Sequence, residues 1–175
     1  MEQLEILEMV LTVENQAAET LPYGLGFHPW LPRRQGTRLR APATTVWHEN
    51  AKHLPTHVEP VSKIPEWDFR QSKSLPQGWI NNGFAGWNRQ AEIIQPEDGL
   101  TISLAASAPL GIYLLFSPSQ SSDFFCFEPV SHLVDAHNLK TDGGLVPLKP
   151  GERLSAFMRL NWHWESKIRR APTIQ

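Results

Sequence analysis

The sequence predicts an all-β fold, a sandwich or barrel of mostly antiparallel strands joined by long loops. Three observations predict it. Apolar and polar residues alternate near the C-terminus, an Asp-Gly turn separates two short apolar runs, and no helical periodicity of any length stands out. The length of 175 residues suits one domain, and no linker or change in composition marks a boundary. We therefore expect residues 1–175 to form a single domain.

The first two segments of the chain are less clearly patterned than the rest. Residues 4–15 fit a helix through Leu4, Leu7 and Leu11, but they fit a strand through the alternation of Leu7, Met9, Leu11 and Val13. We favour a strand, because the run leads into a Pro-Tyr-Gly turn without a helix C-cap. Residues 31–80 are rich in Pro, Arg, Ser and His, and they predict long loops with a few short strands.

The second half of the chain predicts a series of well-defined strands. Residues 91–95 and 100–105 flank the Asp98-Gly99 pair and predict a hairpin. Residues 111–116 and 123–128 are aromatic and β-branched runs that predict central strands. A long strand with one buried face is expected near the C-terminus, where the apolar positions are Leu154, Ala156, Met158, Leu160, Trp162 and Trp164.

The charge balance argues against several classes of partner. The formal net charge is only −2, which does not favour binding to nucleic acid or to an anionic membrane, and no apolar run approaches the length of a membrane span. A signal peptide begins with basic residues, whereas the start of this sequence contains Glu2, Glu5, Glu8 and Glu14, so we do not expect a signal peptide. Cys126 is the only cysteine, so no intrachain disulfide can form. We expect a cytoplasmic protein whose partner is small.

Three motifs that could carry chemistry are weak on inspection. The stretch HENAKH at 48–53 has one residue too many for a zinc-protease helix, and with His57 it is better interpreted as a set of solvated loop histidines than as a metal site. The GLG at 24–26 lacks the third glycine and the helix of a dinucleotide fingerprint. Cys126 lies among apolar residues, where a thiol packs rather than reacts. We therefore expect neither a metal nor a cofactor.

Two ionisable residues next to prolines remain as candidates. Glu128 follows an aromatic strand and precedes Pro129, which we expect to end the strand ladder. Its carboxylate is either a surface charge at a strand end or a buried base whose pKa is raised by desolvation. His28 precedes Pro29, which favours an extended backbone at the histidine. Taken alone, neither residue identifies a function.

Taken together and in order, four stretches of the chain resemble the aldose 1-epimerase, or galactose mutarotase, family. They are LPYGLGFHPWLP (21–32), WINNGFAGWNRQAEI (79–93), DFFCFEPVSHLVDAHN (123–138) and GLVPLKPGERLSAFMRLNW (144–162). The resemblance runs over nearly the whole chain and corresponds to the C-terminal half of a family member. It implies a mutarotase-like β-supersandwich, present in part, and interconversion of the α and β anomers of an aldose without a cofactor.

The resemblance also implies roles for five residues. His28 matches the general acid of the family, and Glu128 matches its general base. Trp30 and Trp87 are expected to stack on the apolar face of the sugar ring. Asn81 occupies the position of an aspartate that holds sugar hydroxyls in the family, and it can exchange hydrogen bonds with them but carries no charge.

The expected partner is a small sugar, either a hexose or a sugar phosphate. For a phosphate, Arg33 and Arg34 are the candidate ligands, although a solvated pair of loop arginines is the simpler interpretation. A homo-oligomer that completes the sandwich is expected, because half of a sandwich exposes apolar faces and strand edges. The alternative function is a catalytically weak or inactive carbohydrate-binding domain.

Overall fold

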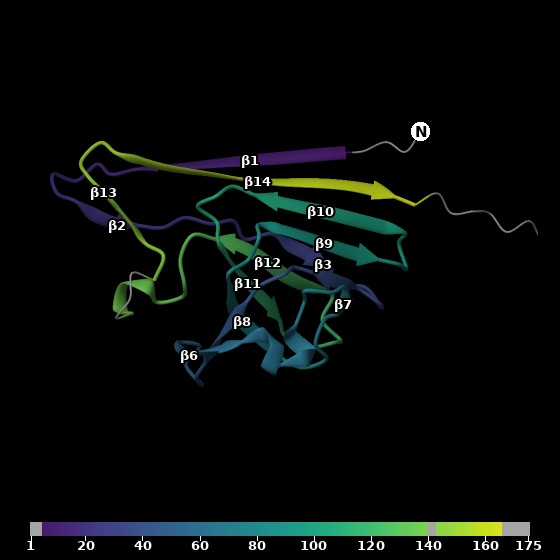
Figure 1. Cartoon of the computed structure of the whole chain (residues 1–175). Helices are drawn as coiled ribbons and strands as arrows, with labels where there is room; N and C mark the ends of the chain where they lie inside the picture. Colours follow the sequence, from purple (N-terminus) through teal and green to yellow (C-terminus); the bar gives the residue numbers. More distant parts are fainter. Residues whose placement is uncertain (1–4, 140–142, 166–175) are drawn as a thin grey trace, which may run out of the picture.

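Two six-stranded antiparallel sheets stack face to face in the computed structural model, which describes residues 5–139 and 143–165 (Figure 1). Leu4 of the first expected strand lies outside the described residues. The first sheet has the order β1 (Glu5–Glu14), β14 (Arg153–Trp164), β10 (Leu100–Ala106), β9 (Gln90–Gln95), β4 (Arg38–Arg40) and β7 (Lys73–Ser74). The second has the order β3 (Trp30–Pro32), β12 (Phe124–Val130), β11 (Ile112–Ser117), β8 (Ile80–Ala85), β5 (Thr45–Glu49) and β6 (Pro55–Pro60).

The remaining elements are short. The strands β2 (Leu21–Tyr23) and β13 (Val146–Leu148) pair with each other, and single 3₁₀ turns occupy Val61–Lys63, Pro65–Trp67 and Ala136–Asn138. None of the helical segments in the described part of the chain has the length and apolar character of a bilayer-spanning helix. The predicted all-β, antiparallel fold class is confirmed, and residues 31–80 form short strands and loops as expected.

The periodicity of the sequence accounts for the first sheet. In β14, Ala156 and Met158 are buried while Ser155 and Arg159 are exposed, as the predicted alternation requires. The predicted hairpin forms between β9 and β10, and Gly99 in its turn has φ +65°, which a residue without a side chain adopts at little cost. β14 lies between β10 and β1, so the expected strand at the N-terminus is confirmed.

Aromatic residues fill the space between the two sheets. Tyr113 of β11 is fully buried, and its ring stacks on Phe84 of β8 at 4.7 Å and on Phe127 of β12 at 4.6 Å between ring centroids. Its hydroxyl donates to the carbonyl of Ala41, 3.2 Å away. Because side chains alternate along a strand, the residues on either side of Tyr113 point to the opposite, outer face of the second sheet.

The strand ladder of β12 does not end at Pro129, and this corrects the sequence-based expectation. Pro129 pairs with Tyr113 and Val130 with Ile112, so β12 continues beyond Glu128. The N and C=O of a strand residue point to the same neighbour, and the Pro129 carbonyl accepts from the backbone N–H of Phe27 at 2.9 Å. The N–H that proline lacks would therefore point toward the irregular segment at Phe27, and the ladder between β11 and β12 needs no donor there.

β1 forms one edge of the first sheet and leaves apolar side chains exposed on both of its faces. Ile6 and Val10 are 61% and 67% exposed on the outer face, and Leu7 and Leu11 remain 44% and 39% exposed on the inner face. Ten residues of β1 pair with β14, and its other side is unpaired in the described structure. A long apolar edge of this kind is a surface that soluble proteins ordinarily cover.

Candidate active site

The outer face of the second sheet carries the candidate site. In the strand register Glu128 of β12 lies opposite Leu114, Leu114 opposite Gly83, and Gly83 opposite Trp47 of β5. Residues that pair in this way point to the same face of a sheet. A second row, two residues along, contains Trp30, Cys126, Phe116 and Asn81. Both rows face away from the core that Tyr113 fills.

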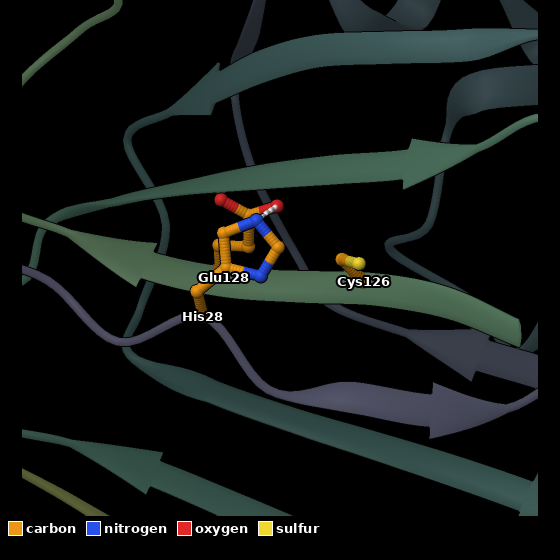
Figure 2. A group of neighbouring side chains, drawn as sticks. All are labelled: His28, Cys126 and Glu128. Carbon is orange, nitrogen blue, oxygen red and sulfur yellow. Dashed lines mark ion pairs between the residues drawn. The ribbon is translucent and has the colours of Figure 1, made fainter.

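The structure brings His28 and Glu128 into direct contact. His28 Nε2 lies 3.1 Å from Glu128 Oε1, and Figure 2 shows the imidazole directly over the carboxylate, with Cys126 further along the same strand. His28 is held between two backbone attachments, the bond from Phe27 N–H to Pro129 and the start of β3 at Trp30. The side chain of His28 is 57% exposed, whereas that of Glu128 is only 11% exposed. An accessible imidazole therefore covers a shielded carboxylate.

Burial governs the ionisation of the two groups on β12. Loss of hydration raises the pKa of Glu128 above its ordinary value, and the nearby His28 opposes that rise without cancelling it. Burial, helped by the charge of Glu128, raises the pKa of Cys126 to about 11. Cys126 is therefore a thiol at neutral pH, as expected for a packing residue. Glu128 is the buried carboxyl that the sequence left as one of two alternatives.

A row of aromatic side chains begins beside His28. Trp30 is 63% exposed and stacks on Phe124 with ring centroids 4.3 Å apart. His28 is roughly parallel to Trp30 at 6.1 Å, and Phe116 lies 6.1 Å from Phe124 on the other side. The exposed indole of Trp30 is thus an apolar surface beside His28, and its stacking on a sugar stays a prediction.

Trp87 lies elsewhere, and its position corrects the expectation that it stacks on a sugar. It is only 3% exposed and contacts Tyr113 and Phe127 edge-on, at 5.5 Å in each case. Its indole N–H donates to the carbonyl of Gln90 at 2.7 Å. These contacts place Trp87 in the core between the sheets, because both partner rings point away from the face of Glu128.

Asn81 lies on the face of Glu128, and it contacts a carboxylate that the sequence did not single out as a site residue. Asn81 Nδ2 donates to Glu49 Oε2 at 2.8 Å, and Trp79 Nε1 donates to Glu49 Oε1 at 2.8 Å. His53 Nδ1 lies 3.0 Å from Glu49 Oε2. Glu49 and His53 both belong to the HENAKH stretch, whose spacing does not fit a helical metal site. A strand ending at Glu49 explains the convergence that the helix template missed.

Two groups of side chains have the donor types of a metal site. The possible ligand atoms of His28, Cys126 and Glu128 lie within 4.8 Å of one another, and so do those of His48, His57 and Glu59. The protonated thiol is a poor ligand for the first group. In the second, the imidazoles of His48 and His57 stack in parallel, 3° apart in orientation, so their lone pairs do not converge. Both histidines lie on strands, β5 and β6, and not in loops as expected.

Comparisons with known proteins concern the family and the fold of the chain. The family model described as aldose 1-epimerase matches residues 2–161. The uncharacterized protein YphB of Escherichia coli K12 is 41% identical over 167 residues, which cover 91% of this chain and 57% of that protein. A solved structure of a provisionally named aldose 1-epimerase from Escherichia coli K12 has a TM-score of 0.82 at 40% identity, and the match covers 91% of this chain and 57% of the other.

A more distant structure shows the fold alone. The galactose mutarotase-like protein of Clostridium acetobutylicum has a TM-score of 0.77 at 17% identity, and the match covers 90% of this chain and 52% of that one. The chain thus spans about half to three fifths of the length of these relatives. The expectation that it corresponds to their C-terminal half is not confirmed. Since the family model covers most of the sequence, the chain belongs to the aldose 1-epimerase family.

Proposed function

We propose that the protein is an aldose 1-epimerase in which Glu128 is the general base and His28 the general acid. The observation that supports this most strongly is the 3.1 Å contact between His28 Nε2 and Glu128 Oε1 on the outer face of the second sheet. Membership of the family supports the reaction class, and the contact supports the choice of residues. The substrate is a small sugar, and the chain's own side chains supply both proton transfers.

The chemistry requires an acid and a base that are close together. In a cyclic aldose the C1 hydroxyl and the ring oxygen are bonded to the same carbon. The base removes the hydroxyl proton while the acid protonates the ring oxygen, so the bond between C1 and the ring oxygen breaks and a free aldehyde forms. Rotation about the C1–C2 bond presents the other face of the aldehyde, and the two transfers then run in reverse. A proton acceptor and a proton donor in hydrogen-bond contact can therefore act on the two oxygens that share C1.

The environment of Glu128 suits the role of a base. Shielding from water raises the pKa of this carboxyl, which increases its affinity for a proton while leaving it able to return that proton. His28 is accessible and can carry the second proton to the ring oxygen. Each transfer contributes roughly 10²- to 10⁴-fold to the rate. Trp30 is placed to cover an apolar ring face next to the pair.

A sugar without a phosphate fits the surroundings better than a sugar phosphate. The guanidinium of Arg33 is bound to Ser117 and to the carbonyl of Pro76, and that of Arg34 is paired with Asp98 at 3.1 Å. Both arginines therefore have partners on the protein. The described contacts show no arginine at the His28–Glu128 pair.

The alternative, a sugar-binding domain with little or no catalysis, is favoured by one observation. Asn81 carries no charge at a position where the family resemblance leads us to expect an aspartate, and a neutral amide holds a hydroxyl less strongly than a carboxylate does. Polarimetry separates the two functions. The approach of pure α-glucose and α-galactose to anomeric equilibrium is followed with protein and with buffer alone.

We expect the protein to accelerate equilibration of at least one of these sugars. Quenching of tryptophan fluorescence by a sugar without any acceleration would indicate the binding domain instead. Equal rates with protein and with buffer, for both sugars, would contradict the proposed enzyme.

A further inference from the structure

A second carboxylate, that of Glu49, is fixed on the same sheet face as Glu128. Glu49 receives hydrogen bonds from three side chains that belong to different segments, namely Trp79, Asn81 and His53, at 2.8, 2.8 and 3.0 Å. Its side chain is only 16% exposed. A carboxylate with three donors has a fixed orientation, and this removes much of the entropic cost of ordering it around a ligand.

The fixed carboxylate lines a small cavity of about 20 Å³, which has room for one small polar group such as a sugar hydroxyl. The floor is formed by Gly83, which has no side chain, and by Asn81, both of β8. Leu133 and Val134, which follow β12, close one side. A Cβ atom added at Gly83 would lie 3.3 Å from Leu114 and 3.5 Å from Leu133, so the glycine keeps this floor open. The cavity therefore combines an apolar wall with a fixed polar group.

The distance from Glu128 to Asn81, whose side chain holds the Glu49 carboxylate, is of the order of one hydrogen-bonded pyranose ring. Asn81, which contacts Glu49, lies two strands across from Glu128, or about 10 Å, and two residues along, or about 7 Å. The backbone positions of Asn81 and Glu128 are thus roughly 12 Å apart, and the side chains of both residues point to the same face of the sheet. A ring built from bonds of about 1.5 Å separates its C1 and C4 oxygens by about 5–6 Å. A hydrogen bond of about 2.7 Å at each end brings the span to about 11 Å.

The remaining hydrogen-bonding capacity of Glu49 selects the kind of ligand. A carboxylate has about four acceptor positions, and the three donors leave one open on Oε1. A sugar hydroxyl can donate to that position, and such a bond to an ionised acceptor is roughly twice as strong as one to a neutral amide. A phosphate monoester carries a charge of about −1.5 to −2 at neutral pH and would be repelled by the negative charge of Glu49.

We propose that Glu49 binds a hydroxyl group at the end of the sugar opposite C1, and that it selects uncharged aldoses over their phosphates. This inference rests on the proposed function for its orientation, because C1 is placed at Glu128. Glu49 supplies the negative charge that Asn81 lacks, and Asn81 holds it in position. Glu49 is thus a specificity determinant, distinct from the pair that transfers protons.

The test compares Glu49→Gln with wild type on galactose, glucose and their 6-phosphates. We expect KM for the preferred neutral sugar to rise at least tenfold, kcat to stay within about twofold, and the pH profile of kcat to be unchanged. Discrimination against the 6-phosphate should fall. Glu59→Gln is the matched control, since Glu59 is a carboxylate on the same hairpin that also pairs with a histidine, His48, at 3.4 Å. Its KM should equal that of wild type.

A binding measurement separates failure of this inference from failure of the proposed function. The 1,5-anhydro derivatives of glucitol and galactitol keep the distal hydroxyls but have no C1 hydroxyl, so they bind without ring opening. If wild type binds one of them and Glu49→Gln binds it at least tenfold more weakly, the inference stands even where no mutarotation is seen. Equal affinity, or equal KM, in wild type and Glu49→Gln would overturn it, as would the absence of any sugar binding by wild type.

A second variant covers the case in which Glu49→Gln does not fold. Trp79→Phe keeps the aromatic contact with Phe116, now at 5.2 Å between ring centroids, but removes the N–H that orients Glu49 Oε1. We expect its KM to rise at least threefold with kcat within about twofold of wild type. An unchanged KM in a folded Trp79→Phe protein would overturn the inference.

Discussion

Replacing Trp87 by alanine should destabilise the fold far more than the same replacement of Trp30. Trp87 is 3% exposed, contacts two buried rings and donates one hydrogen bond to Gln90. Trp30 is 63% exposed, and its closest ring contact is the stack on Phe124. The two tryptophans were expected from the sequence to have the same role, so this comparison tests the correction directly.

The expected magnitudes follow from these contacts. Truncating a buried tryptophan costs about 3–5 kcal/mol, and the lost hydrogen bond adds about 0.5–1.5 kcal/mol. The total of roughly 4–6 kcal/mol is a large share of the 5–15 kcal/mol that holds a typical domain together. For a chain of this size the loss corresponds to a fall in Tm of about 8–24 °C. Loss of the Trp30 stack should cost only about 0.5–1.5 kcal/mol, or about 1–6 °C.

Thermal and urea unfolding, followed by far-UV circular dichroism, measure both effects. Trp87→Phe is included as a variant that keeps a ring in the core and should lose less stability than Trp87→Ala. Sugar affinity is measured on the same samples below their transitions, and we expect it to fall with Trp30→Ala. A Trp87→Ala protein with an unchanged Tm, or one less affected than Trp30→Ala, would refute the assignment of Trp87 to the core.

Three further predictions concern ionisation, reactivity and assembly. Burial raises the pKa of Glu128 in the folded state, so its ionised form destabilises the fold above that pKa. Glu128→Gln should therefore be more stable than wild type at pH 7.5. Urea titrations should show that this difference in stability shrinks as the pH falls through the raised pKa. An advantage that is constant with pH would contradict the assignment. Because the pKa of Cys126 is about 11 and the thiol is buried, it should react with a thiol reagent at neutral pH only as fast as the protein opens. Addition of urea should therefore accelerate the reaction. Fast labelling of the native protein would be inconsistent with a buried thiol. The exposed apolar edge at Ile6 and Val10 should promote self-association. Light scattering should show a molar mass that rises with protein concentration, and the mass should be lower in a variant that carries both Ile6→Lys and Val10→Lys. A constant monomer mass for wild type would argue against self-association through this edge.

Local patterns were sufficient to predict much of the fold. The alternation around Ala156 and Met158 shows which side of the strand meets the core, because the period of two is a property of the extended backbone. At the end of the strand the prediction was wrong, since Trp164 is 50% exposed. The β9–β10 hairpin likewise follows from a glycine that tolerates a positive φ. Pro129 misled the prediction, because whether a proline interrupts a ladder depends on which neighbour its nitrogen faces. That information resides in the tertiary structure.

The site was predictable only in part for a related reason. His28 and Glu128 are 100 positions apart, and only the ordered motifs of the family suggested that they belong together. Trp87 is separated from the end of β8 by Gly86, and its position in the core rather than on the outer face depends on the turn at that glycine, where φ is +68°. Glu49 meets Asn81 only when β5 and β8 pair, so the HENAKH stretch alone does not show which side chains surround this carboxylate.

A double-mutant cycle on His28 and Glu128 tests the central claim most directly. The rate of mutarotation above buffer is measured by polarimetry for wild type, His28→Asn, Glu128→Gln and the double variant, each checked for folding. Groups that transfer protons as a unit are strongly non-additive. We expect each single variant to lose roughly 10²- to 10⁴-fold in kcat and the double variant to lose little more than the worse single variant. Single variants with wild-type rates would contradict the claim that this pair opens and closes the sugar ring.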